Sequence, residues 1–197
     1  MNPANAVTLT SAASALAGLF VLAAPHGAFT TPAVITCVAA SLLLDRVDGA
    51  IARRLKLTSP MGAMLDSLAD LLAFGALPAA LVVSREPSIV TGACALLYGL
   101  GAVWRLARYD EDELTEGRWG PCFKGVPSPA AGAAVAVAVT VECVAPSARG
   151  LAIAVAIAMG ALMPSRVRYP KRGVGAWPWM VLVPLAVIAQ WVTALRG

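Results

Sequence analysis

Four aspartates, Asp45, Asp48, Asp66 and Asp70, occur within 26 residues of an otherwise strongly apolar stretch of the chain. An ionisable side chain inside a membrane segment costs at least ~2.5–3.5 kcal/mol on insertion scales, so it is retained only where something compensates its charge. Carboxylate oxygens suit hard cations, whereas zinc favours cysteine and histidine, and the single histidine, His26, lies far off in the sequence. The pattern therefore predicts a pair of divalent cations, Mg²⁺ or Mn²⁺.

The spacing of these aspartates predicts two half-sites on facing helices. Residues three and four apart lie on one face of a helix. Small residues on the same faces allow a large ligand or a partner helix to approach the backbone, and an adjoining arginine suits bidentate contact with a phosphate. The first half-site comprises Asp45, Asp48, Gly49 and Ala52, with Arg53 beside it, and the second comprises Gly62, Asp66 and Asp70.

Composition sets the fold class. Of the 197 residues, 59% are hydrophobic and 13% are charged, and the mean hydropathy is +0.76. These values indicate an integral membrane protein, and we expect a single domain over residues 1–197. The predicted fold is an all-α, polytopic transmembrane bundle of six to eight helices. Seven apolar segments are counted, at about 7–24, 32–53, 60–84, 88–108, 127–145, 149–163 and 176–195.

Two of these segments carry further detail. Ser59 and Pro60 have the residue types of a helix N-cap and first turn, so the third helix is expected to begin there. Asp70 then lies ten residues into that helix, about 15 Å from its start at 1.5 Å per residue. The sixth segment is short, and with the seventh it is a candidate for a bent or partly re-entrant pair.

Charge asymmetry predicts the orientation. With the N-terminus in the cytoplasm, the loops around 54–61, 109–126 and 164–175 are cytoplasmic and hold most of the lysines and arginines of the loops. Arg85, Arg149 and Arg196 fall on the other side. This bias follows the positive-inside rule and places the aspartates in the cytoplasmic half of a plasma-membrane protein. The net charge of +4 then suits anionic lipid headgroups, and no nucleic-acid motif accompanies it.

The complete pattern resembles a known signature. Asp45-x-x-Asp48-Gly49-x-x-Ala52-Arg53, eight further residues, and Gly62-x-x-x-Asp66-x-x-x-Asp70 match the CDP-alcohol phosphotransferase family at every defining position. The resemblance implies a membrane enzyme that cleaves the pyrophosphate of a CDP-linked lipid, joins the phosphatidyl group to an acceptor hydroxyl and releases CMP. It also implies two metal ions bound by the four aspartates, with Asp70 as the base. The nucleotide would lie against Asp48, Gly49, Ala52, Arg53, Gly62 and Asp66, and the protein would be a homodimer.

Three further segments resemble the phosphatidylserine synthase branch of that family. They are Asp66–Leu71 with Phe74-Gly75 and Pro78-Ala79, then Phe123–Ala131, then Leu162–Pro170, and Arg105-Leu106-Ala107-Arg108 adds to them. The branch implies CDP-diacylglycerol as donor and L-serine as acceptor. One departure follows Arg108, where the branch often carries an aromatic residue and then Asn. This chain has Tyr109-Asp110 and an acidic run, which is either solvated surface or part of the acceptor entrance.

Basic residues in these segments have two interpretations. They either extend from helix ends to the membrane interface, or they bind lipid phosphate or the serine carboxylate. The candidates for acceptor or lipid-phosphate binding are Arg105, Arg108, Lys124, Ser128, Arg166 and Arg168.

Other functions share parts of the pattern. Phosphatidylglycerophosphate and phosphoinositol-type synthases carry the same aspartates and use glycerol 3-phosphate or an inositol phosphate as acceptor. A cation channel or transporter could also bury acidic residues on facing helices. The fixed Gly, Ala and Arg positions and the absence of a broken-helix repeat count against a channel or transporter.

Overall fold

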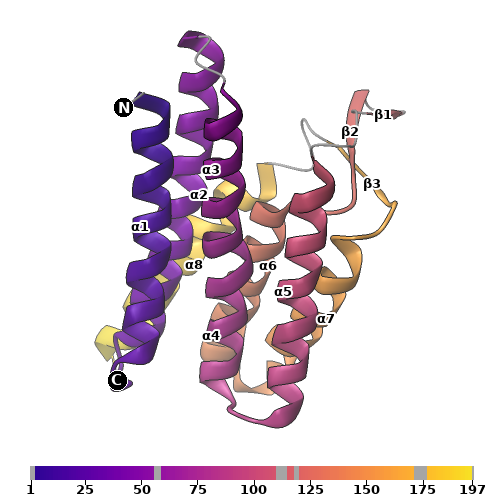
Figure 1. The fold of residues 1–197 in the computed structure, drawn as a ribbon. Helices are drawn as coiled ribbons and strands as arrows, with labels where there is room; N and C mark the ends of the chain where they lie inside the picture. The colour runs from indigo at the N-terminus through magenta and orange to yellow at the C-terminus, as the bar shows by residue number, and fades with distance from the viewer. Residues whose placement is uncertain (1–2, 56–58, 110–114, 118–119, 171–176, 197) are drawn as a thin grey trace.

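Each apolar segment predicted from the sequence forms a helix in the computed structural model, which describes residues 3–55, 59–109, 115–117, 120–170 and 177–196 (Figure 1). The third segment is one continuous helical rod built from α3, η1 and α4, in which η1 is a π-helical stretch. The helical elements are α1 Pro3–Ala23, α2 Thr30–Leu55, α3 Pro60–Asp70, η1 Leu71–Ala76, α4 Leu77–Arg85, α5 Ile89–Tyr109, α6 Ser128–Val144, η2 Pro146–Ala148, α7 Leu151–Leu162 and α8 Trp177–Arg196.

The lengths of the helices fit a membrane bundle. Within the described residues, four are long and apolar enough to cross a membrane: Pro3–Ala23, Pro60–Arg85, Ile89–Arg108 and Pro178–Arg196. The apolar helices α6 and α7 are shorter, and α2 is 26 residues long but carries the charged first half-site. The all-α prediction is confirmed, and the chain is a multi-pass membrane protein.

Helix pairing follows small residues. In α1, the buried positions Ala4, Thr8, Ser11, Ala15 and Gly18 repeat with spacings of four and three, and α1 packs chiefly against α2. Such a stripe of small side chains lets two helix backbones approach closely in a membrane, where packing rather than burial from water holds helices together. The second half of the bundle is built in a similar way, since α6 buries every residue from Ala130 to Ala136, and all but Val135 are alanine or glycine.

The two C-terminal helices do not form the pair that was considered from the sequence. α7 packs against α5 and α6, whereas α8 packs against α6 and α2. Gly160 of α7 lies so close to α5 that a Cβ there would be 2.9 Å from the Tyr98 Cα. Close backbone contact with α5 therefore holds the short helix α7 in place, whereas α8 lies against α6 and α2.

A small antiparallel sheet, which was not predicted, joins the α5–α6 loop to the α7–α8 loop. It lies at the end of the bundle where the first residues of α1 also lie (Figure 1). Its strands are β1 Thr115–Gly117, β2 Gly120–Lys124 and β3 Arg168–Pro170, in the order β1-β2-β3. The residue pair Phe123–Tyr169 and the pair Lys124–Arg168 are opposite each other in the ladder. Strands of three to five residues leave no alternating hydrophobic pattern long enough to detect.

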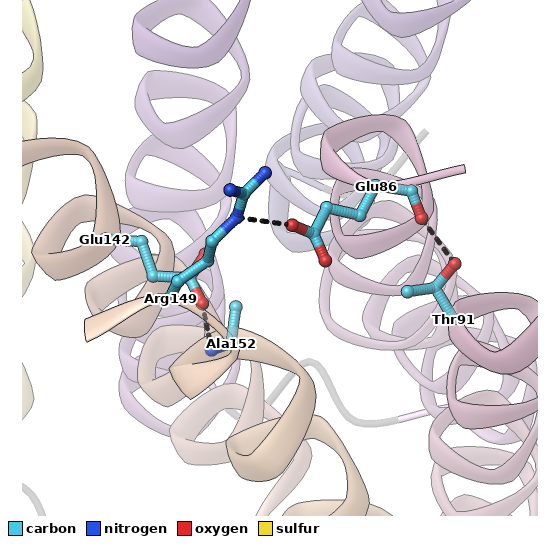
Figure 2. A network of polar contacts seen from close by, with 5 residues as sticks. All are labelled: Glu86, Thr91, Glu142, Arg149 and Ala152. Atoms are coloured by element: carbon cyan, nitrogen blue, oxygen red, sulfur yellow. Dashed lines mark hydrogen bonds and ion pairs between the residues drawn. The ribbon is translucent and has the colours of Figure 1, made fainter. Parts of the chain in front are cut away.

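Polar contacts also join the loops at the opposite end of the bundle (Figure 2). Arg149 Nε donates to Glu86 Oε1 at 2.9 Å, which links the α4–α5 turn to the segment after η2. Glu142 Oε1 accepts a 2.8 Å hydrogen bond from the backbone N–H of Ala152 in the first turn of α7. The Arg149 side chain is 83% exposed, so the ion pair itself contributes little stability, while the Glu142 contact satisfies a helix-end donor.

Candidate metal and substrate site

Three of the four aspartates converge between α2 and α3. Asp45, Asp48 and Asp66 each offer a carboxylate oxygen, and these three oxygens all lie within 4.8 Å of one another. Asp48 is buried, Asp45 is half-buried and Asp66 is exposed. The two half-sites predicted from the spacing therefore do face each other.

The donor set fits a hard divalent cation. Mg²⁺ holds its oxygen ligands at about 2.0–2.1 Å, so two ligands of one ion lie within about 4.2 Å of each other and ligands shared between two ions lie slightly farther apart. A separation of at most 4.8 Å matches this range, and the group contains neither histidine nor cysteine. Three carboxylates this close would repel one another unless a cation or protons offset their charge.

Asp70 lies one helical turn beyond Asp66 and is not one of the three converging carboxylates. Its charge nevertheless interacts with the charges of Asp45, Asp66 and Arg105. Asp70 is half-buried in the last turn of α3. A position one turn from Asp66 suits a group that handles a proton beside the converging carboxylates, and its part in metal binding remains a prediction.

A threonine of α1, which sequence reasoning missed, completes the acidic group. Thr8 Oγ1 donates to Asp48 Oδ2 at 3.0 Å and also lies 3.1 Å from the carbonyl oxygen of Ala4. Both Thr8 and Asp48 are 5% exposed. A hydroxyl bonded to a metal-binding carboxylate fixes the direction of its oxygens. The available signal was the stripe of small and hydroxyl residues along α1, which indicates a packed face but not its partner.

The small residues of the signature help to shape the start of α3 and lie along α2. Ser59 caps α3 as predicted, since its Oγ accepts a 3.0 Å hydrogen bond from Gly62 N. A Cβ at Gly62 would lie 3.1 Å from Ser59 Oγ and 3.2 Å from Asn5 Oδ1, so glycine keeps this cap close to α1. Gly49 is half-buried on α2. Ala52 and Arg53 continue α2, but their side chains lie outside the described residues, and their roles stay predictions.

The basic candidates divide into distinct environments. Arg105 is only 8% exposed, and its Nη1 donates to Oγ of the fully buried Ser128 at 3.1 Å, which joins α5 to the first turn of α6. Arg108 Nη1 donates to the Pro164 carbonyl oxygen at 3.2 Å, which joins α5 to the loop after α7. Arg105 therefore lies in the interior of the bundle, whereas Arg108 is half-buried in the last turn of α5.

The remaining basic candidates lie at the small sheet. Lys124 ends β2 and is half-buried, and the β2–β3 ladder places it opposite Arg168, whose side chain is outside the described residues. Arg166 is exposed. The acidic run that follows Tyr109 also lies outside the described residues, so its interpretation stays open.

Together, the fold and the site define a multi-pass helical membrane protein with three converging carboxylates and a buried arginine. The sequence profile of the CDP-alcohol phosphatidyltransferase family matches residues 1–164. The chain belongs to that family.

Several relatives have the same name, CDP-diacylglycerol–serine O-phosphatidyltransferase. The protein from Mycobacterium tuberculosis (strain ATCC 25618 / H37Rv) is 40% identical over 105 residues, which cover 50% of this chain and 36% of the relative. That from Helicobacter pylori (strain ATCC 700392 / 26695) is 33% identical over 146 residues, covering 70% and 61%. That from Methanocaldococcus jannaschii is 33% identical over 131 residues, covering 66% and 60%. The matched region thus spans about a third to three-fifths of these relatives' own length.

Proposed function

We propose that the chain transfers the phosphatidyl group of CDP-diacylglycerol to the hydroxyl of L-serine, making phosphatidylserine and releasing CMP. The observation that carries the proposal is the convergence of Asp45, Asp48 and Asp66 from two helices, on a signature whose family uses CDP-linked substrates. The shared name of the relatives supports serine as the acceptor.

The carboxylates would hold two divalent cations, Mg²⁺ or Mn²⁺. Bound there, the ions would supply positive charge to the diphosphate oxygens and to the leaving CMP. Asp45, Asp48 and Asp66 keep the ligand oxygens at the required separation, and Thr8 holds the buried Asp48 in one orientation. Gly49, Ala52, Arg53 and Gly62 would border the nucleotide, together with Asp48 and Asp66.

In the transfer step, the serine hydroxyl oxygen forms a bond to the phosphatidyl phosphorus, and the bond from that phosphorus to the CMP oxygen breaks. The hydroxyl proton passes to Asp70, which must come within about 2.6–3.2 Å of it. CMP leaves with the electron pair of the broken bond. The charges of Arg105 and Asp70 interact, so Arg105 can stabilise the ionised form of the Asp70 carboxylate before this group accepts the proton.

Acceptor recognition is assigned to the basic groups on the same side of the bundle. The Arg105–Ser128 pair and Arg108 are held inside the bundle, where a guanidinium can bind a carboxylate or a phosphate through two hydrogen bonds. Lys124, Arg166 and Arg168 would line the approach from the loops. The lysines and arginines of the loops support an orientation in which this end lies at the cytoplasmic face of the plasma membrane, and a homodimer is the expected assembly.

An acceptor panel with purified protein tests the proposal. The protein in detergent or vesicles receives CDP-diacylglycerol, Mg²⁺ and either L-serine, glycerol 3-phosphate, inositol phosphate or no acceptor, and CMP is measured. Release that requires serine supports the proposal. CMP release that requires another acceptor would support phosphatidyl transfer but reject serine as the acceptor. Metal uptake into vesicles without CMP formation would establish a transporter instead.

A further inference from the structure

The helix that carries Asp66 and Asp70 changes its hydrogen-bond register immediately after Asp70. Residues Leu71–Ala76 are π-helical, and the N–H of Leu77 donates to the carbonyl of Leu72, five residues earlier. Pro78 follows, and proline has no N–H. The carbonyl of Phe74, which an N–H at position 78 would satisfy in an α-helix, therefore lacks its usual donor in the helix.

Tyr98 of α5 supplies a donor to that carbonyl. Its hydroxyl donates to the Phe74 carbonyl oxygen at 2.5 Å. Tyr98 and Phe74 are both 0% exposed, so water does not reach this hydrogen bond. A buried carbonyl with no partner is costly inside a membrane, where only the protein can satisfy it. The tyrosine hydroxyl thus offsets, from another helix, the donor that the proline removes.

The same face of α5 meets the third helix at three successive points. Tyr98, Ala102 and Arg105 are spaced by four and three residues, and all three are buried. A Cβ at Gly75 would lie 3.2 Å from the Ala102 Cβ, and the charge of Arg105 interacts with that of Asp70. Tyr98 and Ala102 therefore lie against the π-helical stretch, and Arg105 follows them on the same face of α5, within range of the charge of Asp70.

Helix α6 closes the other side of the π-helical stretch. A Cβ at Gly132 would lie 3.1 Å from the Phe74 Cδ1 and 3.2 Å from the Phe74 Cα, so α6 and the stretch are in direct contact. One turn earlier on α6, Ser128 bonds Arg105. With backbone or side chains against it on both sides, the π-helical stretch has little room to change register without changing these contacts.

We infer that Tyr98 is a positioning residue for Asp70: its hydroxyl, paired with the Phe74 carbonyl opposite Pro78, holds the π-helical register that sets the direction of the proposed base. π-helical turns within α-helices frequently occur at functional sites. The inference rests on the proposed function, because it assigns Tyr98 a part in the step that Asp70 performs. Tyr98 acts through the backbone, since it is 0% exposed and its hydroxyl bonds a main-chain carbonyl.

Two variants alter the same hydrogen bond from opposite sides. Tyr98→Phe removes the donor but keeps the ring. Pro78→Ala restores an N–H that can satisfy Phe74 within an α-helical register, and alanine is the stronger helix former, so this variant should remain folded. The control is Thr140→Val, which removes another buried hydroxyl bonded to a carbonyl, that of Ala136, within α6.

The measurements are kcat and KM for CMP release, the Mg²⁺ concentration that gives half-maximal rate, and Tm. Because misplacement by about 1 Å can cost on the order of 100-fold in rate, we expect kcat to fall by at least about tenfold in Tyr98→Phe and in Pro78→Ala. KM and the Mg²⁺ requirement should change much less than kcat, because Asp45 and Asp48 lie on α2, outside the altered helix, and Thr140→Val should match the parent.

Unchanged kcat in both variants would overturn the inference, and so would an equal loss of kcat and Mg²⁺ affinity, which would indicate general disruption. If Tyr98→Phe does not fold, Pro78→Ala decides the question alone: a parental kcat overturns the inference, and a reduced kcat at parental or higher Tm supports it. Failure of the proposed function is separate, because it would show as no acceptor-dependent CMP release by the parent protein.

Discussion

Replacing Thr8 by valine tests whether α1 takes part in the proposed metal site. The valine keeps the shape of the side chain but removes the hydroxyl that donates to Asp48 at 3.0 Å. A hydrogen bond to a charged group contributes about 1.5–3 kcal/mol, and Asp48 is 5% exposed, so water cannot readily replace the lost donor. At 1.4 kcal/mol per factor of ten, this loss corresponds to about a 10–100-fold weaker metal site, the range found for groups that orient metal ligands.

The assay is CMP release measured over a Mg²⁺ titration. We expect the Mg²⁺ concentration for half-maximal rate to rise about 10–100-fold in Thr8→Val. At saturating Mg²⁺ the rate should return close to that of the parent, because Thr8 acts on Asp48 and not on the reacting atoms. Thr8→Ser keeps the hydroxyl and serves as the matched control. A Thr8→Val protein with the Mg²⁺ dependence of the parent would refute the assignment of Thr8 to the site.

Three further outcomes are expected. Asp70→Asn should abolish turnover while the fold and much of the Mg²⁺ binding, measured by calorimetry, are retained; turnover at the parental rate would exclude Asp70 as the base. Chelation with EDTA should abolish CMP release, and added Mg²⁺ or Mn²⁺ should restore it, whereas activity that persists in EDTA would contradict the role of the carboxylates. Gly160→Ala should lower Tm, with a loss of about 1–3 kcal/mol typical of overpacking. The added Cβ would lie 2.9 Å from the Tyr98 Cα, and backbone cannot move aside as a side chain can.

The sequence determined the features that depend on local pattern. Hydropathy gave the helices to within a few residues, since burial in a bilayer requires long apolar segments wherever they lie in the fold. The spacing of Asp45, Asp48 and Asp66 predicted their convergence, because helical periodicity puts residues three and four apart on one face. Ser59 and Pro60 marked the start of α3 for the same local reason.

Only the tertiary structure decided which distant groups meet. Thr8 bonds Asp48 across 40 residues of sequence, and Tyr98 bonds Phe74 across 24 residues. Likewise, Arg105 binds Ser128 instead of reaching the membrane interface. No local periodicity encodes these partners. The sequence pattern of a helix predicts which of its faces is buried, but it does not predict which residues of a neighbouring helix contact that face. The aspartate pattern can be recognised from the order of the residues. The contacts that α1, α5 and α6 add around it arise only from the packing of the helices.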